Sequence, residues 1–297
     1  MAAFTDIPLS PALLLERSAS AFADRVAIID GERRFSYREF GDRAHRLAGL
    51  LADAGVQPGD RVAALCVNSH AMLELHNGVP MAGAVLVPMN IRLSVGELTY
   101  ILQHSGARLL IATEELADTA STIAESAGIR LILAGAPSSE YEQLLARARP
   151  HFVACADEKG LLAINYTSGS TGRPKGVMYS HRGAYLQALS VAYHIRMGLD
   201  SAYLWTLPMF HCDGWCFTWG VTAATATHVC LRKADPALAW SMICDRGITH
   251  LRAARPPCLP CLPRQPPLLP TAALRVPFTP RLEGRHPRPP CWRAWQS

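Results

Sequence analysis

The sequence has few charged residues and no long apolar run. Only 18% of its 297 residues are Asp, Glu, Lys or Arg, whereas 49% are hydrophobic, so the chain can bury a core and wholesale disorder is excluded. Nowhere does it contain the roughly 18 consecutive apolar residues of a membrane-spanning helix. Residues 1–24 lack the basic start of a signal peptide, and the last four residues match no peroxisomal or lipidation signal. We therefore expect a cytoplasmic protein with no transmembrane segment.

Two further features are missing from most of the chain, regular cysteine spacing and excess positive charge. The nine cysteines are scattered without the pattern of a disulfide framework, so we expect reduced thiols. The net charge of +5 could indicate a nucleic-acid partner. However, residues 251–297 alone carry +7 and hold 12 of the 22 prolines, whereas residues 1–250 carry −2. We therefore expect a near-neutral body with no nucleic-acid partner, followed by a Pro/Arg-rich tail.

The body alternates short apolar runs with amphipathic segments. Two capping boxes, Ser36 with Glu39 and Ser94 with Glu97, predict helix starts. Apolar runs predict strands between these helices, and the alternation is typical of an α/β fold whose mostly parallel sheets are flanked by helices. The predicted strands cover residues 25–29, 34–35, 62–67, 84–87, 109–112, 161–166, 203–207 and 248–251, and further helices are predicted near 69–81, 180–193 and 237–244.

The most informative segment follows the predicted strand 161–166. It reads YTSGSTGRPKGV over residues 166–177, with three glycines and four hydroxyl residues at close spacing. Small residues let backbone N–H groups approach an anion, and hydroxyls and Lys175 add donors and charge, so the segment predicts a phosphate-binding loop. It is not a Walker A loop, because Gly176 follows Lys175 and the glycine spacing differs. A flexible Gly/Ser linker is the alternative, but a linker needs neither Pro174-Lys175 nor a preceding buried strand.

These residues resemble the signature loop of the adenylate-forming enzymes, the AMP-dependent synthetase and ligase family, in particular its acyl-CoA synthetases. Three more blocks are similar to that family's N-terminal domain in order and spacing: SYREFGDRAHRLAGLLADAGVQPGDRVAALCVNS, MAGAVLVPMNIRLSVGELTYILQHSGARLLI and LWTLPMFHCDGW. The last block most resembles members that activate fatty or other carboxylic acids. The resemblance covers about residues 8–251 and implies the fold of an incomplete N-terminal adenylation domain.

The resemblance also implies a reaction and its participants. A carboxylic acid attacks ATP, with Mg²⁺, to give an acyl-adenylate, and coenzyme A then forms the thioester. Lys175 would assist phosphate binding and catalysis, although such loop lysines are also often structural, and Thr167 would contact magnesium. The residues implied to bind the ATP phosphates with Lys175 are Thr167, Ser168, Gly169, Ser170, Thr171 and Gly172.

A second implied group lies in the block LWTLPMFHCDGW. By resemblance, His211 orients the acid and Trp215 covers the acyl pocket against water; the alternative is a packed core histidine beside a buried tryptophan. Cys212 and Cys216 could suggest zinc, but no second ligand pair stands nearby, so buried thiols are expected. The stretch that contains Met89, Asn90 and Arg92 also matches the family, and for it we expect a packing role.

The resemblance ends near residue 251. We therefore expect two parts: a partial adenylation domain over residues 1–251, and residues 252–297, a tail that is disordered or translated out of frame. The tail offers no counterpart to the family's magnesium-binding Glu, ribose-binding Asp or catalytic Lys, since it has no Lys and only one acid. Zinc binding, docking of polyproline helices and non-specific nucleic-acid binding are weaker alternatives for it. Two functions stay open, acid activation by a truncated chain and an inactive product that at most binds nucleotide or acyl ligand.

Overall fold

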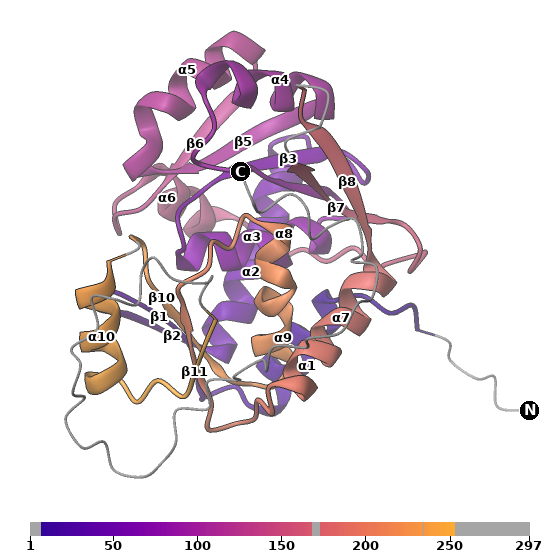
Figure 1. The fold of residues 1–297 in the computed structure, drawn as a ribbon. Coiled ribbons are helices and arrows are strands. Elements are labelled where there is room, and N and C mark those ends of the chain that lie inside the picture. Colours follow the sequence, from indigo (N-terminus) through magenta and orange to yellow (C-terminus); the bar gives the residue numbers. More distant parts are fainter. Residues whose placement is uncertain (1–6, 168–172, 234, 253–297) are drawn as a thin grey trace, which may run out of the picture.

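The computed structural model describes residues 7–167, 173–233 and 235–252. It contains two sheets that lie one above the other in Figure 1. The six-stranded sheet has the order β6-β5-β3-β4-β7-β8, in which only the β7–β8 pair is antiparallel. Its strands are β3 (Arg61–Leu65), β4 (Val85–Pro88), β5 (Ala107–Thr113), β6 (Arg130–Ala134), β7 (Leu161–Thr167) and β8 (Lys175–Ser180).

The five-stranded sheet has the order β11-β9-β10-β1-β2, with β1–β2 as its antiparallel pair. This pair corresponds to the strands predicted over residues 25–29 and 34–35, and Gly31 in the turn between them has a positive φ of 62°, which glycine adopts without strain. The strands are β1 (Val26–Asp30), β2 (Arg33–Ser36), β9 (Ala202–Trp205), β10 (Thr227–Cys230) and β11 (His250–Leu251).

Helices divide the molecule into layers. One apolar cluster fills the space between the two sheets, and it includes α3, all of whose residues are buried. A second cluster joins the six-stranded sheet to α4 and α5, and a third joins the five-stranded sheet to α10 (Figure 1). The helices are α1 (Ala12–Ala21), α2 (Tyr37–Asp53), α3 (His70–Met81), α4 (Val95–Ser105), α5 (Ala117–Ala127), α6 (Glu140–Arg147), α7 (His181–His194), α8 (Cys212–Trp215), α9 (Phe217–Ala223) and α10 (Pro236–Asp245), with a 3₁₀ turn at Glu114–Leu116.

The predicted α/β class is confirmed, and so are the local signals that set helix ends. Both capping boxes form at α2 and α4, and Gly106 ends α4 in the left-handed conformation with φ 62°. Within the described residues no helix is long and apolar enough to cross a bilayer. The prediction of a disordered or shifted-frame tail falls almost wholly on residues 253–297, outside the described residues, and stays a prediction.

One face of the molecule exposes apolar side chains in a regular pattern. On α7, Leu186, Leu189 and Tyr193 are 46%, 42% and 82% exposed. Their i, i+3, i+7 spacing places them in one stripe along the helix. On the neighbouring strand β8, Val177 and Met178 are 43% and 74% exposed. Because successive strand residues point to opposite sides of a sheet, Val177 and Met178 are exposed on different sides. We call the exposed apolar surface of α7 and β8 the α7–β8 face.

Candidate active site

The two strands β7 and β8 bring the ends of the predicted phosphate loop together. Thr167 and Lys175 are register partners at the loop end of this hairpin, and both are exposed. Within the described part of the chain no carboxylate forms an ion pair with Lys175, so its ammonium is available to an anionic ligand. The residues Ser168, Gly169, Ser170, Thr171 and Gly172 lie outside the described residues, and their phosphate-binding role stays a prediction.

Helix α4 supports both sides of this hairpin. The Tyr166 hydroxyl lies 2.8 Å from Nδ1 of His104, and the two rings meet edge to face. On the other side, the Arg173 guanidinium lies over the ring of Tyr100, 5.9 Å from its centroid. Burial raises the pKa of Tyr166, so its hydroxyl keeps its proton at neutral pH. The loop ends therefore rest on fixed aromatic contacts, which the sequence analysis did not anticipate because they join distant segments.

The segment that carries His211 and Trp215 forms a left-handed turn. Five consecutive residues have positive φ: Cys212 (50°), Asp213 (51°), Gly214 (61°), Trp215 (58°) and Cys216 (60°). A left-handed conformation costs a non-glycine residue about 1 kcal/mol or more, so the surrounding structure must hold this turn. Glycine is required at position 214, because a Cβ there would lie 2.7 Å from Cζ3 of Trp205.

Two asparagines from the six-stranded sheet hold this segment. Asn68, which follows β3, donates through Nδ2 to the carbonyls of Trp205 and Leu207 and accepts from the Met209 amide at 2.8 Å. Asn165, in β7, donates through Nδ2 to Oδ2 of Asp213 at 2.7 Å. Its Oδ1 accepts from the Asp213 amide at 3.4 Å.

His211 lies at the start of this turn and is partly buried. Burial lowers its pKa, and the nearby positive charge of Arg92 lowers it further. The imidazole is therefore neutral at neutral pH and can donate or accept one hydrogen bond, but it cannot supply a positive charge to a carboxylate. Trp215 is 50% exposed, so the alternative of a packed histidine beside a buried tryptophan is wrong.

The expected packing role of the stretch at 89–92 is correct for Met89 and wrong for Arg92. Met89 is 1% exposed and packs in the second apolar cluster. Arg92 is exposed, its amide is held by Oδ1 of Asn90, and its charge acts on His211. The exposed cation next to the candidate acid site is a feature that the sequence pattern alone did not distinguish from packing.

The described residues do not build a metal site on their own. Within them, no group of three or more His, Cys, Asp or Glu is arranged to hold a metal ion. Burial, followed by the charge of Asp213, raises the pKa of the Cys216 thiol. Cys216 is buried, as expected, whereas Cys212 is only partly buried. Among the predicted site residues that the structure describes, Thr167 offers a hydroxyl oxygen to a magnesium ion.

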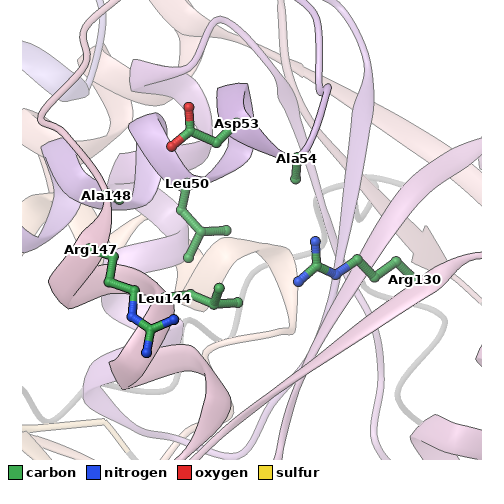
Figure 2. Close-up of a pocket in the computed structure, with 7 residues that line it drawn as sticks. All are labelled: Leu50, Asp53, Ala54, Arg130, Leu144, Arg147 and Ala148. Carbon is green, nitrogen blue, oxygen red and sulfur yellow. The ribbon is translucent and has the colours of Figure 1, made fainter.

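A surface hollow of about 250 Å³ lies away from these residues, between the C-terminal ends of α2 and α6 and the start of β6. Figure 2 shows Arg130 and Arg147 on opposite sides of it and the carboxylate of Asp53 at its edge. Arg130 is already paired with Glu140 at 3.3 Å, and helix C-termini carry partial negative charge that disfavours phosphate. None of the predicted site residues lines this hollow, so it is not the nucleotide site.

A match to known proteins agrees with this geometry. The family model described as AMP-binding enzyme matches residues 15–268. This chain belongs to the AMP-binding enzyme family. It is 40% identical over 271 residues to the peroxisomal acetate/butyrate–CoA ligase of Arabidopsis thaliana, covering 83% of this chain and 48% of that one.

Solved structures of family members superpose closely. The N-terminal domain of FACL13 from Mycobacterium tuberculosis gives a TM-score of 0.75 at 28% identity, covering 82% of this chain and 62% of that one. ATP-bound MatB from Rhodopseudomonas palustris gives 0.71 at 28% identity, covering 81% and 48%. The chain thus corresponds to the N-terminal part of a CoA ligase and spans about half the length of the curated relatives it matches.

Proposed function

We propose that this chain serves the ATP-dependent activation of a carboxylic acid to an acyl-adenylate and then to an acyl-CoA. In the first step a carboxylate oxygen attacks the α-phosphorus of ATP, the bond to the bridging β-phosphate oxygen breaks, and pyrophosphate leaves. In the second step the coenzyme A thiol attacks the acyl carbonyl, its proton is released, and AMP leaves. One observation carries the proposal: Asn165, two residues before Thr167 in β7, bonds to Asp213, two residues after His211.

The nucleotide side of the proposed site is the loop end of the β7–β8 hairpin, where Thr167 pairs with Lys175. Phosphoryl transfer requires positive charge and hydrogen-bond donors around a strongly negative transition state. Lys175 supplies an exposed ammonium there, and Thr167 supplies a hydroxyl. We propose that the loop residues Ser168, Gly169, Ser170, Thr171 and Gly172 complete this phosphate site.

The acid side of the proposed site is the left-handed turn. A neutral His211 would orient the attacking carboxylate through one hydrogen bond, and the exposed charge of Arg92 would attract it. Trp215, half-exposed at present, would cover the acyl group and exclude water from the adenylate. A fatty acid is the proposed substrate class.

Magnesium enters this proposal only as the counter-ion that arrives with ATP. The described residues give it one oxygen, that of Thr167, which is too few for a protein-built site, since magnesium takes six ligands and usually keeps several waters. We therefore derive no step through a resident metal.

The second candidate function is a protein that binds nucleotide or acyl ligand without turnover. Its support is that the chain spans 48% of the length of the Arabidopsis ligase and that the described residues contain no cluster of metal-binding carboxylates. This candidate assumes the proposed boundary between a partial adenylation domain, residues 1–251, and a non-family tail, residues 252–297. Sequencing the nucleotides around codons 250–260 tests whether another reading frame restores family motifs.

A pyrophosphate-release assay separates the two candidates. The full chain is incubated with MgATP, coenzyme A and acetate, butyrate, a long-chain fatty acid or benzoate in turn. Catalysis predicts acid-dependent release that falls by roughly 100-fold or more in Lys175→Ala and Thr167→Ala, because each removes a group that faces the transition state. Arg182→Ala, which alters an exposed pair with Glu158, is the matched control and keeps wild-type release.

Absence of release at high enzyme concentration, together with calorimetric binding of ATP, would establish the second candidate. If neither release nor binding occurs, both candidates are wrong.

We retain the cytoplasm as the proposed compartment, although the Arabidopsis relative is named peroxisomal. Microscopy of the chain fused at its N-terminus to a fluorescent protein tests this, and punctate co-localisation with a peroxisomal marker would contradict it.

A further inference from the structure

The side chains of Asn165 and Asp213 connect two parts of the molecule that sequence places 48 residues apart. Asn165 belongs to β7, whose last residue, Thr167, begins the phosphate loop. Asp213 belongs to the left-handed turn between His211 and Trp215. Both hydrogen-bonding groups of the asparagine amide are used on Asp213, one on its carboxylate and one on its backbone amide.

Burial makes this connection strong. Asn165 is 4% exposed and Asp213 is fully buried. A buried carboxylate without partners is costly, so the donor group of Asn165 stabilises it and fixes its direction. Strand β8 adds to the connection, because the Tyr179 side chain hydrogen bonds with Cys212. Both strands of the phosphate-loop hairpin therefore contact the turn.

The other oxygen of Asp213 faces a histidine at an unusual distance. Its Oδ1 lies 3.6 Å from Nε2 of His76, both side chains are fully buried, and neither atom has a hydrogen bond within the described structure. Nδ1 of His76 lies 2.8 Å from the Met72 carbonyl, which can only accept, so Nδ1 carries a proton. Nε2 and Oδ1 can therefore attract each other only if a second proton lies between them.

Asp213 is therefore hydrogen bonded to one of its two neighbouring side chains, Asn165, and only lies near the other, His76. Asn165 makes two hydrogen bonds to Asp213, whereas His76 is close but not bonded. Because four non-glycine residues in the left-handed conformation cost conformational energy, the surrounding contacts must hold the turn in place. Asn165 links β7 directly to this turn.

We propose that Asn165 and Asp213 are positioning residues that couple the nucleotide end of the site to its acid end. When nucleotide binds beside Thr167 and Lys175, the shift of β7 is passed through Asn165 to Asp213 and so to His211 and Trp215. Neither residue touches the reacting atoms. This inference deepens the proposed function and rests on it for the identity of the ligands.

The test uses three variants of the full chain. Asn165→Asp removes the Nδ2 donor and sets two carboxylates against each other. Asn165→Asp combined with Asp213→Asn lets donor and acceptor trade places and restores a hydrogen bond. Asn68→Asp makes the same chemical change at the other asparagine anchor, whose hydrogen bonds go to Trp205, Leu207 and Met209, and is the matched control.

The first measurement is amide hydrogen exchange of the free protein, followed by mass spectrometry of the peptide spanning residues 212–219. Losing a charge-assisted buried hydrogen bond should speed exchange there roughly tenfold in Asn165→Asp. The double variant should return to within about threefold of wild type, while Asn68→Asp should affect residues 205–209 instead. Unchanged exchange of the turn in a folded Asn165→Asp, or no recovery in the double variant, overturns the proposal. If Asn165→Asp does not fold, the double variant decides in the same way.

The second measurement adds saturating MgATP. In wild type, MgATP should slow exchange in the turn as well as in β7, and it should tighten the binding of butyrate by about fivefold or more. In Asn165→Asp it should protect β7 alone, and the effect on butyrate should vanish, whereas the double variant regains both. Protection confined to β7 in wild type overturns the coupling. If MgATP protects no part of wild type, the proposed function fails, and the exchange data on the free protein still decide whether the two residues hold the turn.

Discussion

Two buried polar regions of this protein differ in how completely their atoms are paired. In the first, at the ends of β1 and α3, Asp30 accepts hydrogen bonds from His70 and Arg232, and Glu74 is held by Arg43 and by the Tyr141 hydroxyl. Among the described residues no side-chain oxygen of its carboxylates lacks a partner.

The second region is the turn around Asp213, where Oδ1 and the facing His76 Nε2 are unpaired and the backbone is left-handed. Polar networks in which every atom is hydrogen bonded stabilise a fold. Strained networks with unpaired polar atoms are found where a protein moves or binds. We therefore expect the first region to stabilise the fold, and the second fits the site that we propose.

The largest expected effect comes from breaking the paired region. Asp30→Ala should lower the free energy of unfolding by about 3–5 kcal/mol, because it removes a buried carboxylate that His70 and Arg232 share and leaves them only Glu142 and Glu115. Urea unfolding followed by circular dichroism measures this. Arg38→Ala is the control, since its pair with Asp24 is 67% and 91% exposed, and it should cost less than about 1 kcal/mol. Equal effects of the two variants would contradict the structural role of the paired region.

Acid should weaken the protein in two stages. Burial lowers the pKa of His228 to about 3, so the unfolded chain binds a proton that the folded chain excludes, and stability falls as pH drops below about 6.5. Burial would raise the pKa of Asp30, but hydrogen bonds from His70 and Arg232 outweigh burial and hold this pKa far below the ordinary range. Hydrogen bonds from His70 and Arg43 do the same for the pKa of Glu142. Their stabilisation is present above pH about 4 and is lost below it.

The contribution of His70 has the opposite sign. Burial would lower its pKa, but hydrogen bonds to Asp30 and Glu142 outweigh burial and raise it. Its stabilisation is therefore complete below about pH 6.5 and is lost as pH rises through its folded value. Unfolding free energies measured from pH 8 to pH 2 should pass through a maximum and lose on the order of 3 kcal/mol between pH 6.5 and 4 from His228. A flat profile below pH 6.5 would contradict the burial of a neutral His228.

The smallest expected effect is a stability difference between two variants at Trp215, which distinguishes the left-handed turn from an ordinary α-helix. Trp215 has a φ of 58°, where glycine is free of the strain that alanine suffers. Trp215→Gly should therefore be more stable than Trp215→Ala by about 1 kcal/mol, the reverse of the order found in α-helices. Thermal unfolding of both variants measures the difference, and the normal order, with alanine ahead, would show that the turn is not left-handed in solution.

Local signals in the sequence predicted much of the fold. The capping residues Ser36 and Ser94 and the apolar strand runs act over a few neighbours, so periodicity and spacing are enough to find them. Strand β8 was not predicted, because its residues are largely exposed and its partner is set by the hairpin rather than by its own pattern. Helices α1, α5, α6 and α9 and strands β6 and β10 were likewise missed.

The candidate site was predictable only where residue type carries the chemistry. Thr167 and Lys175 stand out as a hydroxyl and a cation beside glycines, and His211 and Trp215 came from family resemblance. Asn165 and Asp213 gave no such signal, since an asparagine in a strand and an aspartate in a turn are common. Their importance depends on a contact across 48 residues, which spacing along the chain does not encode.

The α7–β8 face has a consequence for the protein in a cell. A stripe of Leu186, Leu189 and Tyr193 along α7 is an exposed apolar surface of the kind that chaperones and proteases recognise. If no other polypeptide surface covers it, we expect quality control to lower the chain's abundance in a cell. The half-life of the chain in a living cell would then report whether another surface covers the α7–β8 face.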